Sequence, residues 1–216
     1  MMAGLPEDTR DGSIYESAPI QTATPQPTIY IASPQTAYEP LRQGEILSNV
    51  IQFCLNMDAL KRGEYIADPI IHPLAIVLTQ DCDCEQDFIS RRENKSGMTP
   101  AILFCEVDSA EEVAGPGNQS GINSSIRGRI KINKDERYHF FENAVPEVDG
   151  LGEGLPELIC DFKRYFTIPT DEIYHRIDAQ ETKRRCRLAS PYLEHLAVRF
   201  GYFSQRVALP FDHASA

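Results

Sequence analysis

The sequence predicts a mainly β domain with a C-terminal α-helix, preceded by a disordered N-terminal tail. The apolar run 74–78 is short and bounded by proline and polar residues, which is typical of a buried strand. Further β-type runs occur at 101–107, 138–141 and 158–168, and residues 190–206 have the apolar spacing of a helix. With 216 residues, the chain is long enough for one domain with a sizeable core.

Residues 1–40 are predicted to be a flexible tail. They contain six prolines and one basic residue, Arg10, among many Thr, Ser, Gln and Ala residues. Such a composition cannot bury enough apolar surface to order the chain by itself. Residues 28–31 are its only strand-like piece, and we expect them to dock on the domain, which spans residues 41–216.

The domain is expected to open with a strand over residues 44–51, where apolar residues partly alternate. Residues 54–68 are expected to form a loop or a short helical turn, after which Pro69 and Pro73 bracket the entry to the next strand. Residues 108–125 are interpreted as an insertion with one helical turn, and a loop of this length is either functional or mobile.

The final helix is predicted over about residues 190–206. Ser190 is expected at the N-cap and Pro191 at the first helical position. The apolar residues that follow have helical spacing and predict an amphipathic helix across the domain: they are Leu193, Leu196, Ala197, Phe200 and Phe203.

The chain is acidic, with a formal net charge of −11. Residues 1–160 hold 12 Lys and Arg against 25 Asp and Glu, whereas residues 161–216 hold 9 against 7. Overall acidity opposes generic nucleic-acid binding, which depends on phosphate neutralisation. Nucleic acid would therefore have to use the one dense basic run, which is also a candidate surface for an acidic partner: Lys183, Arg184, Arg185 and Arg187. The alternative is a solvated run that balances the acidic body.

No apolar stretch approaches the ~20 residues that span a bilayer, and the N-terminus lacks the features of a signal peptide. The six cysteines are scattered, so reduced thiols are expected. These observations predict a cytoplasmic protein without a membrane partner.

Acidic residues alternate with cysteines directly after the buried run, at Asp81, Cys82, Asp83 and Cys84. If this segment is extended, its carboxylates face one way and its thiols the other. The carboxylates would suit Mg²⁺ or Mn²⁺. The thiols, with a histidine, would suit Zn²⁺, although the Cys-x-Cys spacing is short for a zinc site. The alternative is a turn at the end of the strand, without a metal or other cofactor.

Cys82 is also a candidate nucleophile, with His139 on the predicted aromatic strand as its base. The neighbouring acids oppose thiolate formation. The alternative for His139 is an ordinary strand residue with its hydrogen bonds satisfied.

Four segments in order resemble the PemK/MazF/Kid-like toxins: residues 44–46, 72–79, 99–107 and 160–164. The resemblance implies an SH3-like, partly open β-barrel with a C-terminal helix. Toxins of that class cleave RNA with an arginine before a proline and a Ser or Thr at the end of the next strand. Here His72 replaces the arginine, and the second position falls near Val107 and Asp108, neither of which carries a hydroxyl.

The chain also resembles an uncharacterised bacterial protein family with no established activity. The matching segments are Thr79–Asp83, Asp161–Pro169 and Pro191–Pro210.

Three functions are consistent with these observations. The first is a non-catalytic interaction module, a bacterial accessory protein of a defence- or toxin-type system that binds a protein partner. The second is an endoribonuclease of the PemK/MazF type with an altered site, catalytic at His72 and at acidic residues near Asp81. The third is a metal- or thiol-dependent hydrolase centred on Cys82.

Overall fold

The computed structural model describes residues 28–95, 99–115 and 122–205, and the tail expected over residues 1–27 lies outside them. The described strands are β1 Tyr30–Ala32, β2 Glu45–Leu55, β3 Ala67–Val77, β4 Ala101–Ser109, β5 Tyr138–Phe141, β6 Leu158–Pro169 and β7 Lys183–Leu188. The described α-helices are α1 Met57–Lys61, α2 Asp81–Arg92, α3 Ala110–Ala114, α4 Ser124–Lys131, α5 Thr170–Asp178 and α6 Tyr192–Ser204, and a 3-10 turn spans Pro146–Val148.

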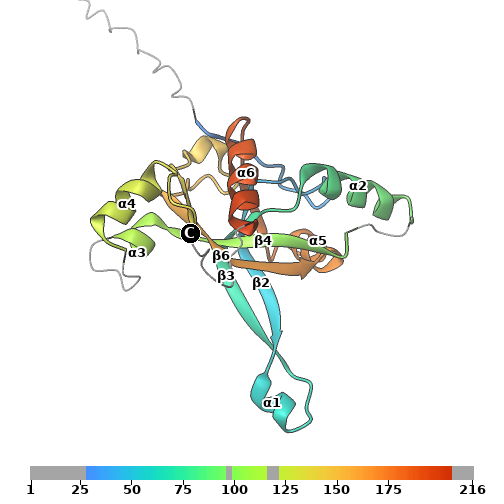
Figure 1. Cartoon of the computed structure of the whole chain (residues 1–216). Helices are drawn as coiled ribbons and strands as arrows, with labels where there is room; N and C mark the ends of the chain where they lie inside the picture. Colours follow the sequence, from blue (N-terminus) through green and yellow to red (C-terminus); the bar gives the residue numbers. More distant parts are fainter. Residues whose placement is uncertain (1–27, 96–98, 116–121, 206–216) are drawn as a thin grey trace, which may run out of the picture.

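The strands form one antiparallel sheet, which confirms the mainly β prediction (Figure 1). Its order is β1-β7-β2-β3-β4-β6-β5, so the first and last described strands of the chain are neighbours. Within the described part of the chain, strand pairing does not close the sheet. Its two edges nevertheless meet, because the Tyr30 hydroxyl donates to the Glu142 carbonyl at 2.8 Å and the Ile29 N–H donates to the Glu142 carboxylate at 3.3 Å. The fold is therefore a partly open barrel.

Apolar side chains are buried on both faces of the sheet. Ile46 and Leu47 are successive residues of β2 and belong to two different apolar clusters, as alternation along a strand requires. Leu196 of α6 completes the first cluster, and Ile173 of α5 completes the second. A smaller third cluster forms around Ile130 of α4.

The C-terminal helix begins two residues later than its predicted start. Pro191 rather than Ser190 is at the N-cap, and the Ser190 hydroxyl bonds to Glu194 at 3.0 Å. The predicted apolar face is confirmed, because Leu196 is fully buried and Phe200 packs against the same cluster.

Residues 28–40 are not part of a flexible tail, so that part of the prediction was wrong. β1 pairs with β7, as the strand-like piece at 28–31 suggested, and Tyr30 is buried. The Arg184 guanidinium donates to the carbonyls of Thr36, Glu39 and Pro40. A side chain from near the end of the chain thus holds this segment.

Residues 81–92 form helix α2, so the cysteine-bearing segment is not extended, and the separation of carboxylates and thiols that an extended segment would give does not apply. The helix begins with Asp81 and Asp83 and ends with Arg91 and Arg92, a charge arrangement that suits the helix dipole. The buried carboxylate of Asp87 accepts from the Arg91 side chain at 2.6 Å, which fixes the last turns.

Candidate functional site: a projecting hairpin and the His72 cluster at its base

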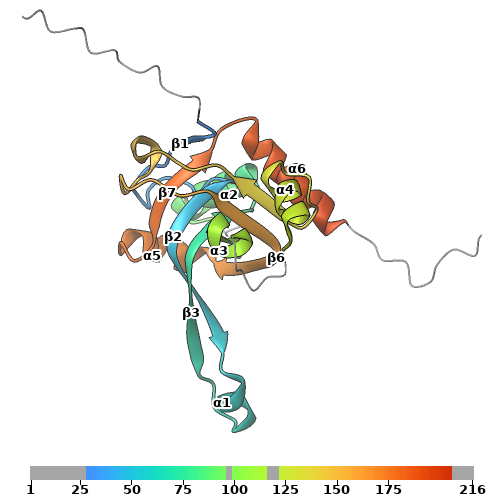
Figure 2. The same cartoon turned by 90° about the vertical axis from the view of Figure 1, so that its left-hand side faces the viewer.

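A hairpin of β2, α1 and β3 projects from the body of the protein (Figures 1 and 2). The pairing of β2 with β7 ends at Ser48, and the pairing of β3 with β4 begins at Ala75. Between them, residues 49–73 form a two-stranded arm with α1 at its tip. Its strands extend about 20 Å beyond the body, at roughly 3.3 Å per residue. We call residues 49–73 the arm.

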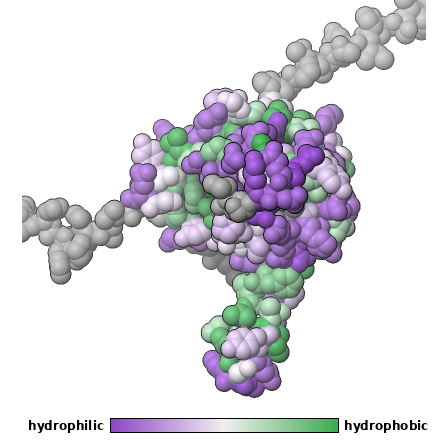
Figure 3. Space-filling model, turned by 90° about the vertical axis from the view of Figure 1, so that its right-hand side faces the viewer, coloured by the Kyte–Doolittle hydropathy of each residue, from purple (hydrophilic) through white to green (hydrophobic). Residues whose placement is uncertain are grey.

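One face of the arm is apolar along residues 51–55 and 67–71. The register places Ile51 opposite Ile71, Phe53 opposite Pro69 and Leu55 opposite Ala67, and directly opposed residues share a face. Exposed fractions are 49% for Phe53, 54% for Leu55 and 59% for Ile71. Figure 3 shows hydrophobic residues along the projecting part where it leaves the body and hydrophilic residues at its far end, whereas hydrophilic residues dominate the visible surface of the body. We call these six residues the apolar face.

Both cations of the arm, Lys61 and Arg62, are paired with carboxylates near its tip. Lys61 lies 2.9 Å from Asp58, and Arg62 lies 2.9 Å from Glu64. The arm therefore presents apolar surface without a strong field of either sign.

The other face of the arm carries His72, which is buried at the base. The His72 ring stacks on Phe166, with ring centroids 3.8 Å apart. Its Nε2 lies 3.4 Å from Gln52 Oε1, and its Nδ1 lies 3.4 Å from Glu106 Oε2. Both ring nitrogens therefore face an oxygen, which fixes the ring orientation.

Glu106 links His72 to Arg164. The Arg164 Nη2 lies 2.6 Å from Glu106 Oε1, and the same guanidinium pairs with Asp108. The Arg164 side chain is 47% exposed, so this cation is open to solvent. We call His72, Glu106, Asp108 and Arg164 the His72 cluster.

Sequence reasoning found His72 but missed its partners. Arg164 and Asp161, three residues apart on β6, have separate partners: Asp161 binds Arg137 at 2.8 Å. The pairing of β6 with β4 shifts register beside Glu106, between Cys105 and Val107. The contact of Arg164 with Glu106 depends on this irregular register, which a single sequence does not give.

The predicted carboxylate and thiol groups of residues 81–84 do not face one shared site. Asp81 accepts the Gln43 backbone N–H at 2.7 Å, Cys82 is exposed, and Cys84 is buried with its thiol near the Thr79 carbonyl. Burial, followed by the charges of Asp81 and Asp83, raises the pKa of Cys84 to about 12. Among the described residues, no group of three or more His, Cys, Asp and Glu side chains is placed to hold a metal ion.

His139 is not brought to Cys82. The thiol of Cys82 lies 3.7 Å from oxygens of Gln80 and Asp83, at the start of α2. His139 lies on β5, where its Nδ1 accepts from Arg199 Nε at 3.1 Å. Burial, followed by the charge of Arg199, lowers the pKa of His139 to about 3, so this imidazole is neutral at pH 7.

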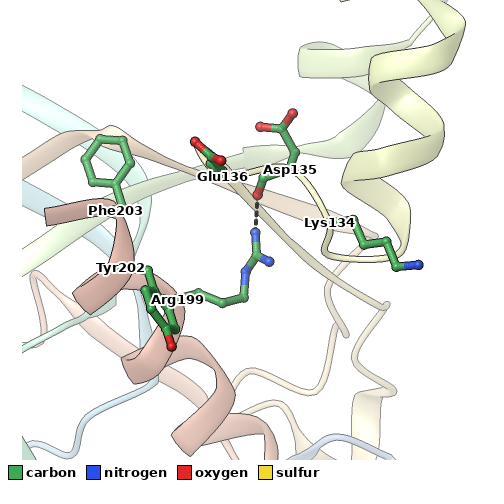
Figure 4. A pocket seen from close by; sticks show the side chains of 6 residues that line it. All are labelled: Lys134, Asp135, Glu136, Arg199, Tyr202 and Phe203. Atoms are coloured by element: carbon green, nitrogen blue, oxygen red, sulfur yellow. Dashed lines mark hydrogen bonds between the residues drawn. The ribbon is translucent and has the colours of Figure 1, made fainter. Parts of the chain in front are cut away.

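Arg199 attaches α6 to the chain before β5. Its guanidinium also donates to the carbonyls of Asn133, Asp135 and Tyr138. It lines a cavity of about 340 Å³ with Tyr202, Phe203 and residues 134–136, and Figure 4 shows Arg199 directed at the main chain of Asp135. The guanidinium is thus occupied by protein carbonyls, which indicates a structural role.

The basic run is a strand, and its two central arginines are buried. Arg184 forms a bidentate pair with Glu45, at 2.6 and 2.9 Å. Arg185, on the opposite face of the same strand, pairs with Asp149 at 2.6 and 2.8 Å. Lys183 and Arg187 are partly exposed, and Lys183 bonds to Gln180 at 2.8 Å. The four side chains therefore do not form one continuous basic surface.

The fold and the site define an antiparallel β-sheet protein with a projecting hairpin that is apolar on one face. Comparison of the chain with family models, with curated proteins and with solved structures found no match in any of the three. Among the described residues, no helix has the length and apolar composition needed to cross a bilayer.

Proposed function

We propose that this protein is a non-catalytic interaction module that binds a protein partner through the apolar face of its arm. The supporting observation is the exposure of Phe53, Leu55 and Ile71 on one side of a hairpin that leaves the body. The further proposal is a cytoplasmic bacterial accessory protein of a defence- or toxin-type system.

Exposure of these side chains is costly unless a partner covers them. Complete burial of one large aliphatic or aromatic side chain contributes about 1.5–3 kcal/mol. Contiguous apolar patches on otherwise polar surfaces commonly mark interaction sites. The charged pairs at the tip offer no unbalanced charge to phosphates, so the chemistry of the arm favours an apolar protein surface over nucleic acid.

The test measures binding to the proteins encoded beside this gene, by calorimetry with purified components. Ile71→Lys places a charge in the apolar face, and we expect it to weaken binding at least tenfold. Val198→Lys is the matched control, because Val198 is equally exposed but lies on α6. Loss of binding in the Val198 variant, with full binding in the Ile71 variant, would show that the partner binds α6 and not the arm.

A second candidate function, an endoribonuclease, draws support from one observation. Arg164 lies beside the carboxylate that also contacts His72, so a permanent, partly exposed cation stands near the histidine that replaces the toxin arginine. Such a cation could stabilise charge that develops on a phosphate. The acidic residue next to His72 is Glu106, whereas Asp81 is bonded to Gln43 on another element.

For the interaction module we expect purified protein to leave single-stranded RNA intact at pH 7, with or without EDTA. Cleavage that is lost in both His72→Ala and Arg164→Ala, and retained in Cys82→Ser, would establish the ribonuclease instead. In the described residues, no observation favours the hydrolase centred on Cys82.

A further inference from the structure

Both strands of the arm have an open edge. Among the residues that the structure describes, β2 has no paired strand beyond Ser48 on the side of β7, and β3 has none before Ala75 on the side of β4. Open edges carry unpaired N–H and C=O groups that can pair with another strand.

The direction of each N–H along the arm follows from one hydrogen bond near its tip. The Asn56 N–H donates to the Ile66 carbonyl at 2.8 Å, so the pair 56–66 is hydrogen-bonded. In an antiparallel ladder, hydrogen-bonded and non-hydrogen-bonded pairs alternate. The pairs 51–71, 53–69 and 55–67 therefore turn their N–H and C=O groups outward. Consistently, the carbonyl of Asn49 accepts from Thr182 on the β7 side.

The two open edges differ in their capacity to accept a strand. On β3, Pro69 and Pro73 occupy outward positions, and proline has no N–H to offer. On β2, the outward positions are Ile51, Phe53 and Leu55, all of which keep their N–H. The edge of β3 is therefore blocked, and the edge of β2 is available.

We propose that the β2 edge of the arm pairs with the β2 edge of a second copy of this chain. The strands run antiparallel about a two-fold axis at Phe53, which places Ile51 of one copy opposite Leu55 of the other. A two-fold axis at Ile51 would bring Phe53 opposite the polar Asn49, whose φ is +56°, and an axis at Leu55 would extend into α1. Among the symmetric registers, only the one with its axis at Phe53 pairs the three outward residues Ile51, Phe53 and Leu55 entirely with one another.

The pairing is self-limiting. It yields a four-stranded sheet in the order β3-β2-β2-β3, and both of its outer edges are the proline-bearing strands. An isologous contact of this kind closes at two copies. It also converts a two-stranded hairpin, which is only marginally stable alone, into a four-stranded sheet.

The charge distribution permits this contact between two acidic molecules. The net charge of −11 belongs to the whole chain, whereas the paired segment Ile51–Leu55 contains no charged residue. Because the axis is perpendicular to the sheet, the apolar faces of the two arms lie on the same side. The dimer does not depend on the proposed protein partner, which would bind that face rather than the edge.

Sedimentation equilibrium of the full chain over a range of concentrations tests the inference. We expect wild-type protein to reach twice the chain mass of 24.3 kDa. Phe53→Pro removes one outward N–H from the β2 edge and should give monomers at the same concentrations. Ile71→Pro removes an outward N–H from the β3 edge, and this matched control should remain dimeric. Wild-type monomers throughout, or equal masses for the two proline variants, would overturn the proposal.

A cross-link tests the register independently of proline. The two-fold axis at Phe53 places residue 52 of one copy opposite Cys54 of the other, in a pair that is not hydrogen-bonded and is therefore close. In a Cys82→Ser background, Gln52→Cys oxidised with diamide should give a covalent dimer, and adding Cys54→Ser should reduce its yield at least tenfold. A covalent dimer that is unaffected by Cys54→Ser, or no covalent dimer, would exclude the Phe53 register. Circular dichroism of each variant confirms that it is folded before the comparison is made.

Discussion

Arg184 and Glu45 form an ion pair in which both side chains are almost completely removed from solvent, with exposed fractions of 1% and 0%. The pair joins β7 to the start of β2. The same guanidinium donates to three carbonyls of the N-terminal segment, so its hydrogen-bonding capacity is used within the protein.

Arg184→Met should strongly destabilise the fold. It leaves the Glu45 carboxylate buried without its cation, and breaking a buried pair typically costs about 3–5 kcal/mol. The free energy of unfolding from urea titration measures this. Lys61→Met is the control, because the exposed Lys61–Asp58 pair should contribute less than about 1 kcal/mol. Equal effects of the two substitutions would contradict the assignment of Arg184 to the core.

Truncation of α6 side chains should reveal which of its apolar residues anchor it. Leu196 is fully buried, so Leu196→Ala should cost about 2–5 kcal/mol. Phe200 is only half-buried, against Phe162 and Tyr165, and Phe200→Ala should cost less. Thermal unfolding of both variants, with the exposed Val198→Ala as control, provides the comparison. A larger loss of stability for Phe200→Ala than for Leu196→Ala would mean that α6 packs differently in solution.

His139 should make stability depend on pH. Its pKa is about 3 in the fold and 6.5 when unperturbed, so below pH 6.5 the unfolded chain binds a proton that the folded chain does not. The contribution of His139 to the free energy of unfolding is therefore fully present above pH 6.5. It decreases as the pH falls, and about 2 kcal/mol is lost at pH 5. Arg199 and His195, which face the ring, act in the same direction.

His139→Asn keeps an acceptor for Arg199 and removes the titration. Urea unfolding at pH 8 and pH 5 should therefore show a smaller loss for the variant than for wild type. Parallel losses in the two proteins would rule out His139 as the source.

The body should fold without the arm. Residues 53–69 can be replaced by Asn-Gly, which joins the paired residues Gln52 and Ile70 through a tight hairpin turn. This replacement removes the cation–π interaction in which the Arg176 guanidinium lies 5.3 Å from the centre of the Phe53 ring, and such an interaction contributes about 0.5–1 kcal/mol at an exposed site. We expect a melting temperature within a few degrees of wild type by calorimetry. A larger fall would show that the arm supports the barrel.

Short apolar runs predicted many of the strands, because a strand that is buried in the core must consist largely of apolar residues. The segments 101–107, 138–141 and 158–168 lie in β4, β5 and β6, and each contains fully buried residues. Helix α2 was missed for the converse reason. Its buried positions are held by Cys84, Asp87 and Ser90, so no apolar periodicity marks it.

The functional regions were only partly predictable from the sequence. His72 was recognised from its place before a proline, but Glu106 and Arg164 reach it through strand register. The basic run was wrongly interpreted as a possible surface, because the carboxylate that buries Arg184 lies 139 residues away. Neither the contacts of His72 nor the Arg184–Glu45 pair can be recognised from neighbouring residues in a single sequence.

The position of β7 between β1 and β2 has a consequence for synthesis of the chain. Residues 28–41 are synthesised before β7, yet β7 is their pairing strand, and the guanidinium that holds them belongs to Arg184, 148 positions after Thr36. The barrel cannot be completed until β7 has left the exit tunnel. A chain that stops before residue 183 would leave Tyr30 without its pairing strand and the carbonyls of residues 36–40 without Arg184, and would be a target for chaperones or proteases.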